Sequence, residues 1–177
     1  LADFYIKNDY HSSESALTQN KMVRVFINCK SKHATQNARA ACVNAGYAFD
    51  FVHYKDRPNM NPVALMSEFD IAITSGRGAV EALASGLETL IYRSDYDPKG
   101  YNTGVTSDGW VTEDNIDDLA SVNYSGRFHS HNWDIDDLTE ALFGYKRREN
   151  LRHRIIDMHD SENITASLLN LMERVPA

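Results

Sequence analysis

Cysteine is scarce in this chain of 177 residues, and the two that occur, Cys29 and Cys42, exclude a disulfide framework. Neither a CxxC pair nor a Cys/His metal spacing is present, so the cysteines predict no metal site. His129 and His131 flank Ser130, but no third ligand follows at a fixed spacing, and a polar surface loop is the preferred interpretation. Two free thiols fit a reducing compartment. We therefore expect a cytoplasmic protein, with any membrane association made through a longer full-length chain.

Positive charge and long apolar runs are also lacking. The formal net charge is -7, which disfavours binding to nucleic acid or to an anionic membrane surface. No run approaches the ~20 apolar residues of a membrane span, so no transmembrane segment is expected. The chain opens on Leu1 with no signal peptide, and we expect it to be a piece of a longer protein.

The regular part of the sequence alternates strands and helices. Residues 1–21 are polar and predict a linker or disordered start, and residues 22–177 predict one domain. Apolar, β-branched runs predict strands, and segments with helical spacing between them predict crossover helices. This order predicts an α/β fold, a doubly wound parallel sheet with right-handed crossovers, helices on both faces and further helices at the C-terminus. The expected strands are 22–29, 47–54, 70–74 and 88–93, and the expected helices are 33–46, 57–69 and 78–86.

The pattern loosens after Tyr92. Residues 94–110 are rich in glycine and aspartate and predict a long connection, of the kind that is either functional or mobile. Residues 112–121 begin with a capping signal and predict a short acidic helix. Residues 134–175 predict two C-terminal helices divided near 157–163.

The turn after the third strand carries the main functional signal. Ser75, Gly76 and Gly78 let the backbone approach a ligand, and the helix that follows offers unpaired N–H groups and a positive dipole end. Arg77 adds charge, and Glu81, placed on the first helical turn, suits the hydroxyls of a ribose. The sequence therefore favours a nucleotide diphosphate. Good turn formers and a helix dipole explain the same residues without a ligand, and both interpretations stay open at this point.

Residues 51–92 resemble the donor-binding half of GT-B glycosyltransferases, and the half-fold is shared by non-hydrolysing UDP-N-acetylglucosamine epimerases. Residues 108–127, which end in NYSGR, are also similar to a segment of bacterial glycosyltransferases. The resemblance implies a Rossmann-like domain that forms one half of a GT-B fold. It is carried, in order, by Val52 to Tyr54, Met60, Asp70, Ser75-Gly76, Glu81, Gly86 and Leu90 to Tyr92.

The resemblance also implies roles for individual residues. The amides of Ser75 and Gly76 would hold the donor pyrophosphate, and Glu81 would bind the ribose. The backbone around residues His53, Tyr54 and Lys55 would pair with the base, commonly uracil, which makes a UDP-sugar the expected donor.

The chain departs from the pattern of these families at the first strand-to-helix turn, which lacks the glycines often found there. Lys30 or Lys32 would then supply charge for the phosphates, unless this is a solvated loop. No metal or other cofactor is expected, because the helix end stabilises the diphosphate. The acceptor site and any general base are expected on an N-terminal GT-B domain that this chain lacks, so no catalytic residue is assigned. The alternatives are a fragment of a sugar-nucleotide epimerase and a non-catalytic flavodoxin-like module that binds a nucleotide or a protein.

Overall fold

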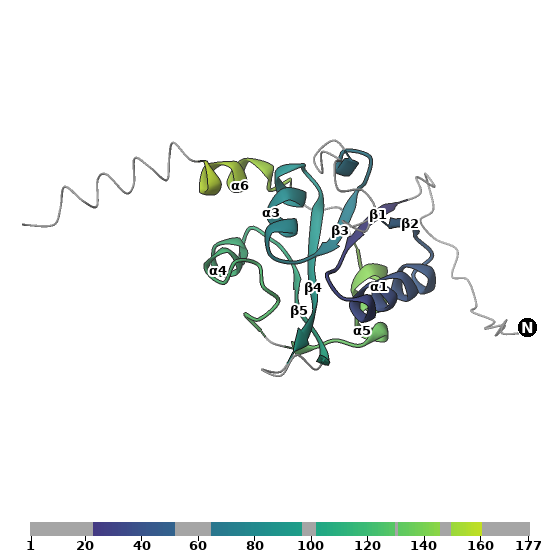
Figure 1. Cartoon of the computed structure of the whole chain (residues 1–177). Helices are drawn as coiled ribbons and strands as arrows, with labels where there is room; N and C mark the ends of the chain where they lie inside the picture. Colours follow the sequence, from purple (N-terminus) through teal and green to yellow (C-terminus); the bar gives the residue numbers. More distant parts are fainter. Residues whose placement is uncertain (1–22, 52–64, 97–101, 130, 146–149, 161–177) are drawn as a thin grey trace, which may run out of the picture.

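The computed structural model describes residues 23–51, 65–96, 102–129, 131–145 and 150–160, and their centre is a six-stranded sheet (Figure 1). The strand order is β2-β1-β3-β4-β5-β6. The first four strands are parallel, and the last two run antiparallel to their neighbours. The strands are β1 (Arg24–Asn28), β2 (Ala48–Phe51), β3 (Ile71–Thr74), β4 (Glu88–Tyr96), β5 (Asn102–Trp110) and β6 (His131–Asn132).

Helices cover both faces of this sheet, as the alternation of strands and helices predicts (Figure 1). On one face, Val25 and Ile27 of β1 pack with α1 and α5. On the other face, Phe26 packs edge-on against Phe69, with ring centroids 5.5 Å apart, and α3, α4 and α6 cover the neighbouring strands. The helices are α1 (Lys32–Asn44), α3 (Arg77–Ala84), α4 (Ile116–Ser121), α5 (Ile135–Phe143) and α6 (Arg152–His159).

Strand order reverses between β1 and β3. The chain passes from β1 through α1 to β2 on one side, and β3 then adds on the other side of β1. A crevice at the carboxyl ends of two strands that diverge in this way is the usual ligand position in an open α/β sheet. Here α1 and α3 both begin at that crevice, with Ser31 and Gly76 as their N-cap residues.

Two predictions about the second half of the chain are wrong. Residues 94–110, expected as a long connection, include the end of β4 and all of β5, which pair as an antiparallel hairpin with two register shifts. The region from residue 134 to 157, expected as one helix, is divided into α5 and α6, because α5 ends at Phe143 with Gly144 as its C-cap residue. The short acidic helix is confirmed as α4.

Other expectations fall outside the described residues: the polar start 1–21, most of the helix expected at 57–69, and the chain after Asp160. In the part of the chain that the structure describes, no helix combines the length and the apolarity that crossing a bilayer requires.

Candidate functional site

A cleft of about 190 Å³ lies at the point where the strand order reverses. Its walls come from four places: the turn after β1, the turn after β3, the middle of β4, and the segment that follows α4. The residues that line it are Lys30, Ser31, Ser75, Gly76, Arg93, Ser94, Asn123 and Ser125. The structure therefore brings together Lys30, Ser75 and Gly76 of the predicted site with five residues that the sequence did not single out.

The first wall is the start of α1. The Ser31 hydroxyl accepts a hydrogen bond from the Ala34 amide at 3.0 Å and is hydrogen-bonded to the hydroxyl of Ser94 on β4. These bonds satisfy one amide of the first helical turn and fix the helix end against the sheet. The remaining first-turn amides of α1 have no acceptor within the helix and carry the positive end of its dipole.

The second wall is the turn between β3 and α3. Gly76 has φ 60° and ψ -136°. This backbone conformation is strongly disfavoured for any residue that carries a side chain. Its N–H donates to the Tyr124 carbonyl at 2.8 Å, so this amide is engaged by the protein. The Ala79 amide donates to the Gly76 carbonyl at 2.9 Å, so the amides that this wall can offer an anion are those of Arg77 and Gly78 at the start of α3.

The charge of the cleft lining is positive, in contrast to the net charge of the chain. Lys30 and Arg93 line it, and among the described lining residues none is acidic. Two cations and two helix N-termini around one small cleft favour an anion, and phosphate groups suit this arrangement of donors.

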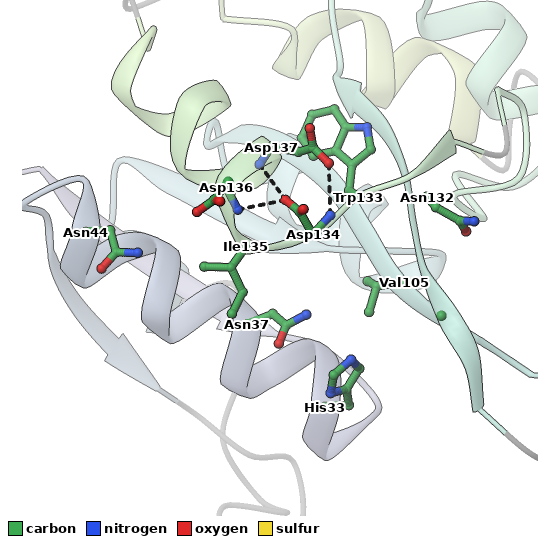
Figure 2. A pocket seen from close by; sticks show the side chains of 11 residues that line it. His33, Asn37, Asn44, Val105, Asn132, Trp133, Asp134, Ile135, Asp136 and Asp137 are labelled. Carbon is green, nitrogen blue, oxygen red and sulfur yellow. Dashed lines mark hydrogen bonds between the residues drawn. The ribbon is translucent and has the colours of Figure 1, made fainter.

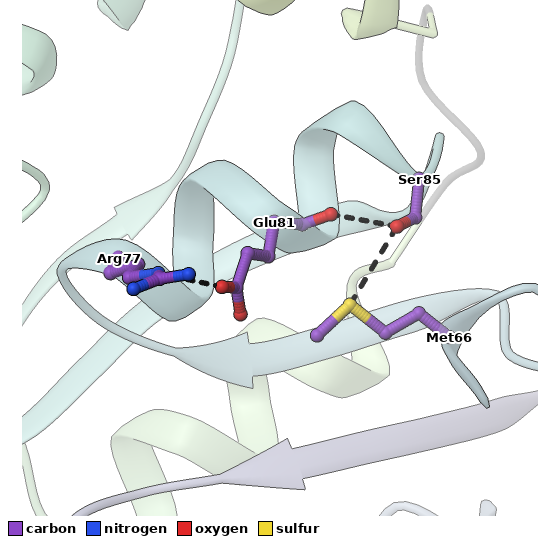
Figure 3. Close-up of polar contacts among 4 residues, drawn as sticks. All are labelled: Met66, Arg77, Glu81 and Ser85. Atoms are coloured by element: carbon purple, nitrogen blue, oxygen red, sulfur yellow. Dashed lines mark hydrogen bonds and ion pairs between the residues drawn. The ribbon is translucent and has the colours of Figure 1, made fainter. Parts of the chain in front are cut away.

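The other predicted residues that the structure describes, Lys32, Arg77, Gly78 and Glu81, are not among the residues that line this cleft. Glu81 lies on the second turn of α3 rather than the first, because the helix starts at Arg77. Its carboxylate accepts a bond from Arg77 Nε at 2.8 Å, with side chains 91% exposed for Arg77 and 25% for Glu81 (Figure 3). Lys32 is exposed at the start of α1, two residues from Lys30. His53, Tyr54 and Lys55 lie outside the described residues.

Gly78 has a packing role in the structure. A Cβ atom at this position would lie 2.5 Å from Thr74 Oγ1, so only glycine lets the first turn of α3 pack this closely on β3. Thr74 in turn donates from Oγ1 to the Asn28 carbonyl at 3.0 Å, which links β3 to β1. The glycine that the sequence analysis assigned to ligand approach thus also serves helix-to-strand packing.

Cys29, next to Lys30, does not supply a nucleophile. Burial, with a smaller contribution from nearby Cys42, raises the pKa of the Cys29 thiol to about 12. A thiol with this pKa stays protonated at neutral pH, whereas nucleophilic cysteines are thiolates.

A second, larger cleft of about 850 Å³ lies between α1 and the start of α5 (Figure 2). Three carboxylates line it, Asp134, Asp136 and Asp137, together with His33 and other side chains. Asp134 Oδ1 accepts bonds from the amides of Asp136 and Asp137 at 2.8 and 2.9 Å, and Asp137 Oδ2 accepts from the Asp134 amide at 2.9 Å. The Asp134 and Asp137 carboxylates cap α5, and the negative charge of all three carboxylates would repel a phosphate. The smaller cleft is therefore the candidate for an anionic ligand.

The five lining residues that the sequence analysis missed come from β4, the start of α1 and the segment after α4. Ser31 carried an N-cap signal. Asn123 and Ser125 belong to the NYSGR segment, whose similarity was noted without a role for its residues. Arg93 gave no local signal, because only the pairing of β4 with β3 brings it to the cleft.

In the described residues, no group of three His, Cys, Asp or Glu side chains is arranged to hold a metal ion. His129 and His131 stack with ring centroids 6.0 Å apart. Comparison of the chain with protein-family models, with curated proteins and with solved structures gives no match in any of the three.

Proposed function

We propose that this chain is the donor-binding domain of a GT-B type glycosyltransferase and that the cleft at Ser75 and Gly76 takes the diphosphate of a nucleotide sugar. One observation carries the proposal: the N-termini of α1 and α3 meet Lys30 and Arg93 in a single cleft where the strand order reverses. The resemblance of residues 51–92 and 108–127 to such enzymes supports the same assignment.

The chemistry follows from the charges. When the bond between the sugar and the diphosphate breaks, negative charge grows on the leaving diphosphate. Helix-terminal amides and fixed cations, already oriented before the reaction, stabilise that charge without further rearrangement. A partner domain would supply the acceptor site and any general base, so this chain would bind and activate the donor rather than complete the transfer alone.

The ribose would extend along α3 from the cleft. Glu81 lies five residues beyond Gly76, which is about 7.5 Å along a helix axis at ~1.5 Å per residue. In this arrangement the diphosphate occupies the helix start and the ribose hydroxyls reach the Glu81 carboxylate. The Arg77 guanidinium, paired with Glu81, would then border the same ligand.

Isothermal titration of the full chain with UDP, inorganic pyrophosphate and uridine tests the proposal. We expect UDP to bind most tightly, pyrophosphate more weakly and uridine least, because the cleft recognises phosphate and the nucleoside adds contacts. UDP binding no tighter than uridine binding would contradict the assignment.

Lys30 and Lys32 provide a matched pair for this test, since the sequence could not choose between them. Lys30→Gln removes a cation from the cleft lining, and Lys32→Gln removes an exposed cation two residues away that does not line it. We expect Lys30→Gln to weaken UDP binding and Lys32→Gln to leave it unchanged. The loss caused by Lys30→Gln should be smaller at high salt, where charge interactions are screened. Equal losses in both variants would indicate a general field effect instead of a site.

A further inference from the structure

The segment Asn123–Gly126, directly after α4, has an unusual backbone. Asn123 and Tyr124 have φ values of 54° and 49°, and Gly126 has a φ of 74°. A left-handed conformation costs a residue with a side chain about 1–2 kcal/mol, and a bulky residue such as tyrosine rarely adopts it. The rest of the structure must therefore hold this segment in place.

A buried tyrosine anchors the segment. The Tyr124 side chain is 0% exposed and packs in the core between α3, α4 and α6. Its amide donates to the Leu119 carbonyl at 2.7 Å, and its carbonyl accepts from the Gly76 amide at 2.8 Å. The anchor therefore joins the end of α4 directly to the turn that opens α3 at the cleft.

The same segment holds the side chain of Arg93. Arg93 Nη1 donates to the Ser125 carbonyl at 3.0 Å, and Nε donates to the Ser94 carbonyl at 3.1 Å. A Cβ atom at Gly126 would lie 2.8 Å from Cγ and 2.9 Å from Cδ of Arg93, so the aliphatic stem lies directly against the glycine. These two carbonyl acceptors orient the guanidinium at the edge of the cleft.

We propose that Arg93 is the cation that contacts the ligand diphosphate, and that Gly126 is a positioning residue that gives the arginine stem its place against the wall of the cleft. Arg93 lines the cleft with Lys30, and a planar guanidinium binds phosphate oxygens in pairs, which a lysine does not do. This inference rests on the proposed function, because it takes the cleft to be the diphosphate site.

The test is isothermal titration of the full chain with pyrophosphate and, separately, with UDP. Arg93→Ala is expected to weaken pyrophosphate binding about 10- to 100-fold, the usual loss for a hydrogen-bonded charge. Arg93→Lys, which keeps the charge without the paired donors, is expected to fall between wild type and Arg93→Ala. Arg39→Ala, which removes an exposed arginine of α1 that does not line the cleft, serves as the control and should bind as wild type does.

The role of Gly126 is tested by a double-mutant cycle. Gly126→Ala places a methyl group against Cγ and Cδ of Arg93, so it should displace the guanidinium and weaken pyrophosphate binding about tenfold. In the Arg93→Ala background those two atoms are gone, and Gly126→Ala should have no further effect on binding. Circular dichroism of each variant checks the fold, and Arg93→Lys remains informative if Gly126→Ala does not fold.

The outcomes separate the two proposals. If Arg93→Ala binds pyrophosphate as tightly as wild type while UDP still binds wild type well, Arg93 is not the contact and the nucleotide site stands. If pyrophosphate binding depends on Arg93 but UDP binds no more tightly than pyrophosphate, the inference stands and the nucleotide-sugar assignment fails. If wild type does not bind pyrophosphate, the inference is overturned as well. An equal effect of Gly126→Ala in both backgrounds would assign that glycine a purely structural role.

Discussion

Replacement of Gly78 by alanine tests whether helix α3 is held to the sheet as the structure describes. The new Cβ atom would lie 2.5 Å from Thr74 Oγ1. A carbon and an oxygen atom that are not bonded do not come this close, so either the helix or the Thr74 side chain would have to shift. Thr74 is 1% exposed and its hydroxyl is bonded to the Asn28 carbonyl, so it has little room to move. Overpacking of a tight site costs about 1–3 kcal/mol.

The alanine also brings a gain, which lowers the net effect. Alanine is favoured over glycine within a helix by up to about 1 kcal/mol. We therefore expect Gly78→Ala to lower the free energy of unfolding by about 1–2 kcal/mol. For a domain of this size each kcal/mol corresponds to about 2–4 °C in Tm, which calorimetry or thermal circular dichroism resolves.

The partner residue gives the decisive comparison. Thr74→Ala removes the atom that the new methyl group meets, and its own cost is about 1 kcal/mol for the lost hydrogen bond. The double variant Thr74→Ala/Gly78→Ala should be more stable than the sum of the two single effects predicts. Gly46→Ala is the control, because Gly46 has a φ of 77° but open space around it, so its cost should not depend on residue 74.

Strict additivity of the two substitutions, or a Gly78→Ala variant as stable as wild type, would refute the packing account of Gly78. UDP binding of the double variant then separates packing from recognition. If Gly78 serves packing alone, the double variant binds UDP as the Thr74→Ala single variant does.

Glu81→Gln should change the free energy of unfolding by less than about 0.5 kcal/mol in a urea titration, because its pair with the exposed Arg77 is partly solvated. The same variant should weaken calorimetric binding of UDP and leave pyrophosphate binding intact, and equal effects on both ligands would contradict a ribose role. Asp134→Ala removes the N-cap and capping box of α5 and should cost about 1–2 kcal/mol in thermal unfolding, whereas Asp134→Asn should retain most of that stability. Burial raises the pKa of Cys29 and Cys42 from 9.0 to about 12, so the unfolded thiols ionise while the native thiols stay protonated. Stability should therefore fall as pH rises from 9.0 to about 12, and a Cys29→Ala/Cys42→Ala variant should show a smaller fall in urea unfolding.

The parallel half of the sheet could be predicted because its signals are local. Strands buried on both faces give continuous apolar runs, as in β1 and β3. Gly46 and Gly86 follow α1 and α3 with φ values of 77° and 84°, and this left-handed requirement makes glycine a dependable end signal. The alternation of strands and helices then favours parallel order with helices on both faces.

Strand β5 could not be predicted because its polar residues are satisfied only once the chain has folded, in part by strand β4. The Ser107 hydroxyl donates to the Ile91 carbonyl at 2.6 Å and accepts from the Gly109 amide at 3.0 Å. Both contacts lie beside the register shift between Ile91 and Tyr92, where a bulge makes room for glycine and aspartate. A composition that is typical of a loop is therefore compatible with a buried strand once β4 lies beside it.

The residues of the candidate site show the same difference between local and long-range signals. Ser75 and Gly76 were predicted as cleft residues because small residues directly after a strand are visible in the local sequence. Arg93 and Ser125 were missed because only the fold brings them to the cleft. Glu81 was assigned to the first turn because the sequence does not show that α3 starts as early as Arg77.

The antiparallel hairpin explains why the segment after α4 forms one of the walls of the cleft. A right-handed crossover after β4 would carry the chain across a face of the sheet and away from the carboxyl ends. Strand β5 instead runs back along β4, and α4 then lies against the same face as α3, so the segment after α4 reaches the Gly76 turn. The bond between the Gly76 amide and the Tyr124 carbonyl depends on this path. The stretch expected as a connection is thus what closes the cleft around Arg93, and the binding properties of the cleft should depend on the hairpin as much as on the glycine-rich turn.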